Sequence, residues 1–325
     1  MKIIDIGTYL PKKHIPTSLE ISNLESDFNK YSTIAIENNL FPLDMLYESI
    51  LPIKSNKNLN NINWLIHNSY HFNGYNHYHS PTCWLQNKLE IENLISLNVN
   101  HGCNGLMSIF LACNLLKVEE NSSVLCTFSE RFNTSDFSRW NADYNLIYAD
   151  GAASVVVSNN SSLPSLATIL SIQHTSTPQL EGLARLAQPK CIKEFNPHDI
   201  RTCKFQFIRR GMSIQKIQEI SSSAIQNLVK DIKKSTNSEK LVIDHLILPN
   251  FGYKTLKNDY LPYLPIPNKT CSIDWGLTVG HIGSSDCFIR LKELLDNKQL
   301  SSKDTVLVLS VGVGVTWTMA LLEID

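Results

Sequence analysis

The stretch from Asn98 to Met107, Asn-Val-Asn-His-Gly-Cys-Asn-Gly-Leu-Met, constrains the fold more than any other part of the sequence. A short apolar run over 94–97 precedes it and is typical of a strand. Apolar residues at helical spacing follow it, namely Leu106, Ile109, Phe110, Cys113 and Leu116. We therefore expect Cys103 in the turn where a buried strand is followed by a buried helix.

A thiol at the start of a helix lies near unpaired backbone N–H groups and the positive end of the helix dipole, which both favour the thiolate. Gly102 and Gly105 flank Cys103 and leave room for a backbone or a substrate to come close. This arrangement is typical of an acyl-accepting nucleophile. Free cysteines are, however, most often buried packing residues, so this stretch alone leaves both interpretations open.

The composition limits the classes of function. A chain of 325 residues corresponds to two domains or one large fused unit, and 43% hydrophobic residues suffice for a large core. The net charge of −1 argues against a general basic surface for nucleic acid or membrane. The eight cysteines contain no CxxC pair, and no signal peptide or membrane-spanning run is recognisable. We expect a protein of the reducing cytoplasm.

Strand and helix patterns alternate along the chain, which predicts the α/β class. A polar, turn-rich segment over 159–164 is the best internal boundary, giving an N-terminal half (1–160) and a C-terminal half (161–325). In the second half we expect an irregular segment over 175–205, a long helix over 211–234 and a strand over 241–248.

Four histidines over 67–79 (His67, His71, His77 and His79) raise the question of a metal site. They lack His-x3-His spacing on a convincing helix and have no paired cysteine, so we interpret them as a loop near an entrance and predict neither metal nor cofactor.

Several motifs occur in the order found in ketoacyl synthase III enzymes of the thiolase superfamily, and the chain resembles that family over nearly its whole length. They are Ile6–Pro11, Cys103, Tyr148–Ala153, Pro249-Asn250, Val279–Asp286 and Gly312–Trp317. The resemblance implies a duplicated thiolase fold, a layered αβαβα sandwich that usually forms a homodimer. It also implies an acyl-Cys103 intermediate, with the backbone N–H groups of Cys103 and Val313 as the oxyanion hole.

Two positions depart from the pattern of a decarboxylating ketoacyl synthase III. That pattern has His after the proline, where this chain has Asn250, and Asn after the glycine, where this chain has His281. An Asp follows at position 286. The segment resembles instead the synthase III-like acyltransferases of natural-product pathways, which use a Cys–His–Asp triad and need a base for the acceptor's proton.

A pairing of His281 with Asp286 has a geometric condition. Within one helix their five-residue offset would place them on different faces, so we expect His281 in a loop and Asp286 in the first helical turn, with Ser284 or Ser285 as the N-cap. Alternatives stay open: Asp286 as a first-turn acid favoured by the helix dipole, His281 as a structural histidine, and Asn250 as an amide that satisfies a loop.

The identity of the acyl donor depends on a further departure. Synthase III enzymes that use coenzyme A usually carry a Trp/Thr-Gly-Ile stretch near residue 30, whereas this chain has Asn-Lys-Tyr-Ser-Thr over 29–33. This favours an acyl-carrier-protein thioester over coenzyme A. Arg209-Arg210, Lys254 and Lys257 are candidates for contact with an acidic carrier protein, or simply solvated residues.

The sequence thus predicts an acyltransferase of secondary metabolism, acting through acyl-Cys103 on an alcohol, amine or activated-carbon acceptor. His281 is the expected general base, Asp286 its orienting partner, and Asn250 a residue that positions acceptor or donor. One alternative is a carbon–carbon condensing enzyme of fatty-acid or polyketide synthesis, and another is a non-catalytic partner subunit.

Overall fold

A computed structural model describes residues 1–14, 30–56, 58–59, 61–70, 79–132, 137–144, 146–185, 200–312 and 314–325. The strands of the first half are β1 (Lys2–Tyr9), β2 (Lys13–His14), β3 (Ile34–Ala35), β4 (Ile62–Asn68), β5 (Ile95–Val99), β6 (Ser123–Glu130) and β7 (Gly151–Ser158). Its helices are α3 (Pro42–Ser55), α4 (Pro81–Leu89) and α5 (Gly105–Leu115).

The strands of the second half are β8 (Ala167–Ser176), β9 (His245–Ile247), β10 (Thr270–Cys271), β11 (Thr305–Gly312) and β12 (Thr316–Ile324). Its α-helices are α6 (Ile200–Arg209), α7 (Ile214–Ser235), α8 (Tyr253–Thr255), α9 (Ile273–Gly276) and α10 (Asp286–Asp296). Short 3-10 turns span Pro178–Ala184, Leu261–Tyr263 and Gly283–Ser285, and a π-helical turn spans Leu256–Tyr260.

The large sheet contains the same five-strand pattern twice. Its order is β10-β9-β11-β12-β8-β1-β7-β6-β4-β5, so the order β1-β7-β6-β4-β5 corresponds to β8-β12-β11-β9-β10. In each set, the first three strands pair antiparallel and the last three pair parallel. The α/β prediction is confirmed. The expected boundary at residue 160 lies in the connection between β7 and β8. The division of the chain into two domains stays a prediction.

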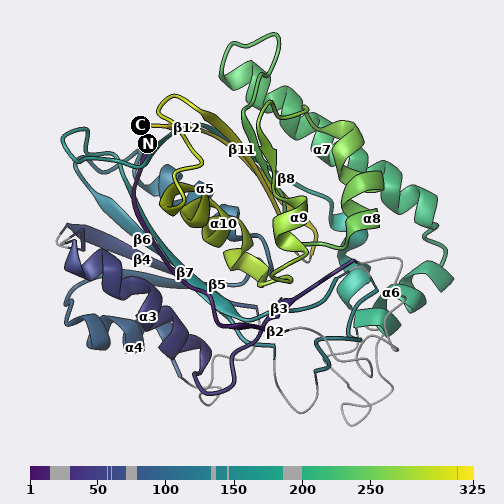
Figure 1. Ribbon diagram of the computed structural model, residues 1–325, viewed down its shortest axis with the longest axis horizontal. Coiled ribbons are helices and arrows are strands. Elements are labelled where there is room, and N and C mark those ends of the chain that lie inside the picture. Colours follow the sequence, from purple (N-terminus) through teal and green to yellow (C-terminus); the bar gives the residue numbers. More distant parts are fainter. Residues whose placement is uncertain are drawn as a thin grey trace.

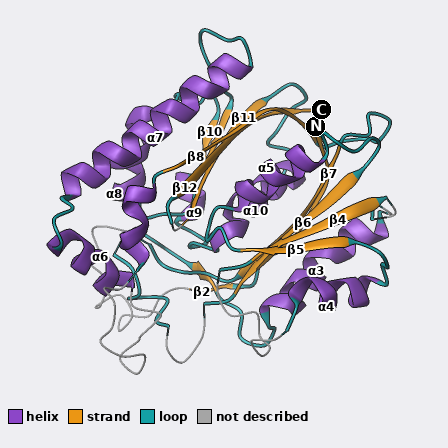
Figure 2. Cartoon of the chain, turned by 180° about the vertical axis from the view of Figure 1, so that it is seen from behind, coloured by secondary structure: helices purple, strands orange, loops and turns teal. Residues whose placement is uncertain are grey.

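Helices cover the two halves of the sheet on both sides. Helices α5 and α10 lie side by side between the half-sheets, with α3 and α4 outside one half and α7 and α8 outside the other (Figures 1 and 2). The central layer is apolar because α5 buries Leu106 and Ile109 while α10 buries Phe288 and Leu291 in the same core cluster. The layered αβαβα arrangement expected from the sequence is therefore present, and it brings the N-terminus of α5 close to the segment that precedes α10.

Two expectations about local structure are wrong. The segment 175–205 is not irregular throughout, because α6 begins at Ile200 and a 3-10 turn spans Pro178–Ala184. Helix α6 buries only Ile200 and Cys203, so its apolar pattern is too sparse to predict a helix. The strand expected over 241–248 is limited to β9, because only His245–Ile247 pair with neighbouring strands.

A buried ion pair between Arg139 and Asp150 joins several loops of the first half. Asp150, fully buried, accepts two hydrogen bonds from the guanidinium of Arg139, and further ones from the backbone N–H groups of Phe132 and Glu37. Arg139 also donates to the carbonyl of Tyr148. One carboxylate thus joins the segments that contain Glu37, Phe132 and Arg139, and its buried oxygens are satisfied by these bonds.

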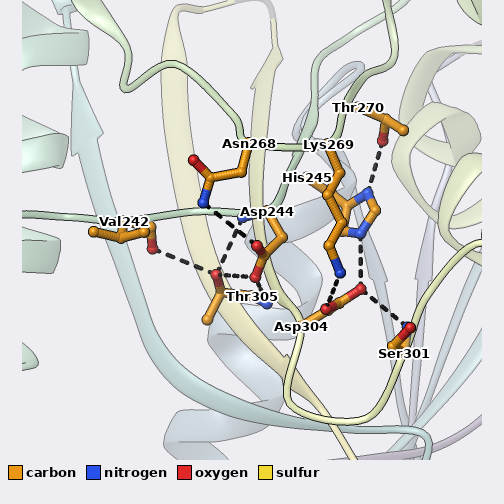
Figure 3. A network of polar contacts seen from close by, with 9 residues as sticks. All are labelled: Val242, Asp244, His245, Asn268, Lys269, Thr270, Ser301, Asp304 and Thr305. Atoms are coloured by element: carbon orange, nitrogen blue, oxygen red, sulfur yellow. Dashed lines mark hydrogen bonds and ion pairs between the residues drawn. The ribbon is translucent and has the colours of Figure 1, made fainter.

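A second polar network joins the beginnings of β9, β10 and β11 at the far end of these strands from Asn250 (Figure 3). The Oδ2 of Asp304 lies 3.0 Å from His245 Nε2 and accepts a 3.0 Å bond from Ser301 N–H, and Lys269 Nζ lies 2.5 Å from Oδ1. Burial tends to raise the pKa of Asp304, but hydrogen bonds from Lys269, Ser301 and His245 outweigh it and lower this pKa to about 2.

The low pKa of Asp304 predicts a pH-dependent contribution to stability. The folded pKa lies below the value of about 3.9 expected in an unfolded chain, so ionised Asp304 stabilises the fold at neutral pH, and this contribution is lost as the pH falls toward 2. Asp304→Asn should lower the free energy of unfolding at pH 7, and the gap from wild type should shrink between pH 5 and pH 2. Urea titrations at several pH values measure the gap, with the exposed Asp231→Asn as the control for lost charge. A gap that is constant with pH would contradict this account.

Candidate active site

Cys103 lies, half-buried, in the turn between β5 and α5, as the sequence predicts. Gly102 adopts a φ of 54°, which disfavours any residue with a side chain. Gly105 opens the helix and packs against the second half, since a Cβ at this position would lie 2.1 Å from the carbonyl oxygen of Ser284. Both glycines are thus required by geometry, and the second one brings the two halves into contact beside the thiol.

The backbone N–H of Cys103 is not used within the part of the chain that the structure describes. The carbonyl of Cys103 accepts hydrogen bonds from Gly105 N–H and from Ser310 Oγ, whereas no described residue accepts one from the Cys103 N–H. This donor therefore has the property that an oxyanion hole requires. Val313, the other expected donor, lies outside the described residues.

His281 lies in the loop before α10, and its imidazole pairs with Asp286 at the first residue of that helix. The Nδ1 of His281 is 2.6 Å from the Oδ2 of Asp286, and both side chains are almost completely buried. The loop conformation depends on Gly280 and Gly283, which have φ values of 87° and 69°. Ser285 is in the N-cap position but its side chain makes no capping bond. The geometric condition for the pairing is therefore met.

Asn250 supplies a second set of contacts to the same carboxylate. Its backbone N–H donates to Asp286 Oδ2 at 2.9 Å, and its side-chain Nδ2 donates to Asp286 Oδ1 at 3.1 Å and to the Gly280 carbonyl at 2.8 Å. The backbone N–H of Ile282 completes the set with a 2.7 Å bond to Oδ1. Asp286 is thus a buried residue held by four hydrogen bonds, not an acid on a helix surface.

The pKa of His281 is raised well above its ordinary value. Burial lowers the pKa, but the negative charge of Asp286, the neighbouring Cys103 sulfur and the hydrogen bond to Asp286 together raise it by more. The second ring nitrogen, Nε2, is buried and has no hydrogen-bond partner of ordinary geometry among the described residues. It therefore remains available for the thiol of Cys103 or for a reacting group.

Aromatic residues enclose the imidazole. The ring centroids of Tyr148 and Phe251 lie 5.7 and 5.2 Å from that of His281. Burial raises the pKa values of Tyr70 and Tyr148, and the nearby charge of Cys103 adds to the effect in both. These rings exclude water from the site and strengthen its electrostatic interactions.

Two buried asparagines beside Cys103 were not predicted to belong to the site. Asn68 ends β4 and bonds the backbone of the Cys103 turn, while Asn104 donates to the hydroxyls of Thr316 and Thr318 on β12. A polar residue at the carboxyl end of a predicted parallel strand was the available signal for Asn68, because sites in α/β sheets form at those ends.

The histidine-rich segment gives no metal centre within the described residues. His67 is buried, with Nδ1 3.0 Å from Thr127 Oγ1, while His71 and His77 lie outside the described residues. No group of three or more potential metal ligands occurs in the described ranges. Within the same ranges, no helix is long and apolar enough to cross a membrane.

Basic side chains lie beside Tyr253, three residues after Asn250, and at the end of α6. Lys30 and Lys257 lie 4.2 and 5.6 Å from the ring centroid of Tyr253. Arg209 stacks over Phe205, an exposed aromatic side chain of α6. Their role in binding a carrier protein stays a prediction.

Comparison with known proteins identifies related sequences and folds. Residues 234–324 match the family model described as 3-oxoacyl-[acyl-carrier-protein] synthase III C terminal. No curated protein matches the sequence. Among solved structures, the chain is similar to ChlB3, described as an acyltransferase, with a TM-score of 0.88 and 20% identity over 99% of this chain and 97% of that chain.

Two further structures are similar to a lesser degree. The 3-oxoacyl-[acyl-carrier-protein] synthase III of Aquifex aeolicus has a TM-score of 0.78 and 17% identity over 99% of both chains. Xanthomonas campestris OleA, solved with lauric acid and lauroyl-CoA, has a TM-score of 0.74 and 13% identity over 99% of this chain and 98% of that chain. The chain therefore has the thiolase fold in its ketoacyl synthase III-like form, and its C-terminal part carries the sequence pattern of synthase III.

Proposed function

We propose that the protein is an acyltransferase that takes an acyl group from a thioester onto Cys103 and passes it to an alcohol, amine or activated-carbon acceptor in secondary metabolism. The observation that carries the proposal is the buried His281–Asp286 pair, which the contact of Gly105 with Ser284 brings beside the turn that holds Cys103. A nucleophile, a base and an orienting carboxylate in this order are the parts that acyl transfer requires.

The first half-reaction starts from a Cys103 thiolate and a protonated His281. The sulfur attacks the thioester carbonyl, the carbonyl electron pair moves onto oxygen, and the Cys103 N–H donates to that oxyanion. When the intermediate collapses, the bond to the donor sulfur breaks, and the leaving thiolate takes the proton from His281. The products are acyl-Cys103, a free donor thiol and a neutral imidazole.

The second half-reaction uses the neutral imidazole as a base. Acylation removes the charge of the Cys103 sulfur, and with it one of the causes that raise the pKa of His281. His281 then accepts the acceptor's proton as the acceptor attacks the acyl carbon, and collapse of the intermediate expels the Cys103 thiolate. The charges return to those of the free enzyme, so one histidine serves both steps without another base.

The contacts of Asn250 favour this reaction over decarboxylative condensation. Condensation needs side-chain donors directed at the developing enolate oxygen. Here the Nδ2 of Asn250 bonds Asp286 and Gly280, and the Nδ1 of His281 bonds Asp286. We therefore propose that Asn250 positions Asp286 and does not bind acceptor or donor, which revises the role expected from the sequence.

A non-catalytic subunit remains the alternative from another class. Such a subunit would have no need for a buried His–Asp pair beside a half-buried thiol, because burying charged groups costs free energy that only function or excellent hydrogen bonding compensates. This chain has both Cys103 and an Asp286 carboxylate that accepts four hydrogen bonds, which favours a catalytic role.

The donor is proposed to be an acyl-carrier-protein thioester, with coenzyme A as the alternative. Lys30 and Lys257 flank Tyr253, three residues after Asn250, so an acidic partner would meet positive charge on this side of the site. The exposed Phe205 with Arg209 offers an apolar contact and a cation on α6.

A homodimer is proposed through the edge strand β5. Its outer edge has no strand partner among the described residues, and Ile95 and Leu97 on one face are 52% and 39% exposed. An exposed apolar edge strand is otherwise an aggregation hazard, so we infer that a second copy pairs with it. In such a dimer, the turn that carries Cys103 begins next to the interface.

The dimer predicts a simple mutational outcome. Ile95→Lys combined with Leu97→Lys should convert a dimer into a monomer in analytical ultracentrifugation, because two buried charges would face the partner strand. Ile266→Lys, at a residue that is 90% exposed elsewhere on the surface, is the control and should leave the mass unchanged. A wild-type protein that is monomeric at micromolar concentration would contradict the proposal.

The proposed pairing of the Cys103 thiolate with His281 predicts the order in which the thiols react. Limiting iodoacetamide should label Cys103 before Cys83, although Cys83 is exposed, because the His281 imidazolium stabilises the reactive thiolate. Cys113 should react more slowly than either, since burial raises the pKa of its thiol to about 11. In His281→Ala, labelling of Cys103 should slow far more at pH 6 than at pH 9. Peptide mass mapping measures the order, and first labelling at Cys83 in the wild type would contradict the assignment.

The two half-reactions predict how triad variants fail. With Cys103 preloaded at high pH, His281→Ala should transfer the acyl group about 10²- to 10⁴-fold more slowly than wild type, because the base is lost. Asp286→Asn should be slower by a smaller factor, because the imidazole remains but is held less well. Single-turnover mass spectrometry follows the transfer, and malonyl thioesters should release little carbon dioxide. Stoichiometric decarboxylation with a carbon–carbon product would instead establish the condensing alternative.

A further inference from the structure

Asn68 makes both of its side-chain bonds to the turn that carries Cys103. It is the last residue of β4 and is completely buried. Its Oδ1 accepts a 3.0 Å hydrogen bond from His101 N–H, and its Nδ2 donates a 3.1 Å bond to the carbonyl of Gly102. These two partners also fix which side-chain atom is oxygen and which is nitrogen, because an N–H must meet the oxygen and a C=O the nitrogen.

The second of these bonds has a consequence for Cys103. The carbonyl of Gly102 and the N–H of Cys103 belong to one planar trans peptide, so they point in opposite directions. The bond from Asn68 draws the carbonyl toward β4, and it thereby directs the Cys103 N–H away from β4. That N–H is the donor for which no described residue is an acceptor. Asn68 thus controls the orientation of a free backbone donor without touching it.

Among the described residues, no other side chain bonds the carbonyl of Gly102 or the N–H of Cys103. Gly102 at a φ of 54° has no side chain to restrain it, and its N–H bonds only the side chain of Asn100, 3.2 Å away. Without Asn68 the Gly102–Cys103 peptide would be free to rotate, because glycine accepts a wide range of backbone angles.

We propose that Asn68 is a positioning residue for acyl transfer, which holds the Gly102–Cys103 peptide so that the Cys103 N–H donates to the oxyanion of the tetrahedral intermediate. The inference rests on the proposed acyl-Cys103 chemistry. In that step the new C–S bond forms at Cys103, the carbonyl electron pair moves onto the oxygen that the N–H stabilises, and the donor thiol leaves with the proton from His281.

Two reactions of the same thiol separate this role from a merely structural one. Loading from a thioester passes through a tetrahedral oxyanion, whereas alkylation by iodoacetamide displaces iodide from a saturated carbon and forms none. A loss of fold or of thiolate slows both reactions, but a misdirected N–H slows loading alone. The measured quantity is therefore the ratio of the loading rate to the alkylation rate of Cys103.

Asn68→Ala removes both bonds, and Asn68→Asp keeps the acceptor for His101 but loses the donor to Gly102. For each of these variants that folds, the ratio should fall by about 10- to 100-fold. A misdirected oxyanion donor slows the reaction by at most as much as a deleted donor does. The probes are N-acetylcysteamine thioesters of acetyl to octanoyl groups and iodoacetamide, with intact-mass and peptide mass spectrometry as readouts.

Asn159 provides a matched control at the other end of α5. Its Oδ1 accepts from Ser122 N–H at 2.9 Å, and its Nδ2 donates to the carbonyls of Leu116 and Glu119, so it too holds a turn by its backbone. Asn159→Ala should leave the ratio at the wild-type value even where it lowers stability. Suppose that the wild-type enzyme is acylated by a thioester. If the Asn68 variants then have the wild-type ratio of loading to alkylation, or if both of their reactions are slower by the same factor, the role of Asn68 is refuted. If wild type loads with none of the thioesters, the proposed function fails, and the role of Asn68 fails with it.

Discussion

The carboxylate of Asp286 is the group on which the rest of the site depends. It is buried, it begins α10, and it accepts four hydrogen bonds from His281, Ile282 and Asn250. A buried charge is tolerated only when its lone pairs are satisfied, so these contacts fix the loop before α10 and the end of the β9 segment together. They also orient the imidazole, because the bond at Nδ1 leaves Nε2 directed toward other groups.

The duplicated architecture brings this carboxylate to the thiol. Each half-sheet ends in parallel strands, and the two central helices lie side by side between the half-sheets (Figure 1). The first half contributes Cys103 and Asn68, which bonds the turn that holds Cys103. The second half contributes His281 and Asp286. Gly105 permits the contact, since its hydrogen lies where a Cβ would strike Ser284. The site is therefore a property of both halves and would not form in either one alone.

Much of the fold and part of the site could be predicted from the sequence, because both depend on short-range patterns. The strand–turn–helix around Cys103 has its own apolar periodicity, and Gly280 and Gly283 mark the loop in which His281 lies. The burial of Asp286 and the task of Asn250 could not be predicted, because they depend on a contact between residues 36 positions apart. Helix α6 was missed since only Ile200 and Cys203 are buried in it, so its apolar pattern is sparse. Asn68 had a visible position at the end of a strand, but nothing in the sequence indicated its partner.

The central claim is that Asp286 and Cys103 together raise the pKa of His281, so that acylation of Cys103 lowers this pKa and prepares the imidazole to act as a base. Nitrogen-15 NMR of histidine-labelled protein tests this most directly, with the His281 signals assigned by their loss in His281→Ala. The His281 pKa should be raised above its ordinary value in the wild type and should be lower in Cys103→Ala, where the sulfur is absent. A neutral His281 in the wild-type enzyme at pH 7, or a titration unchanged by Cys103→Ala, would contradict this claim.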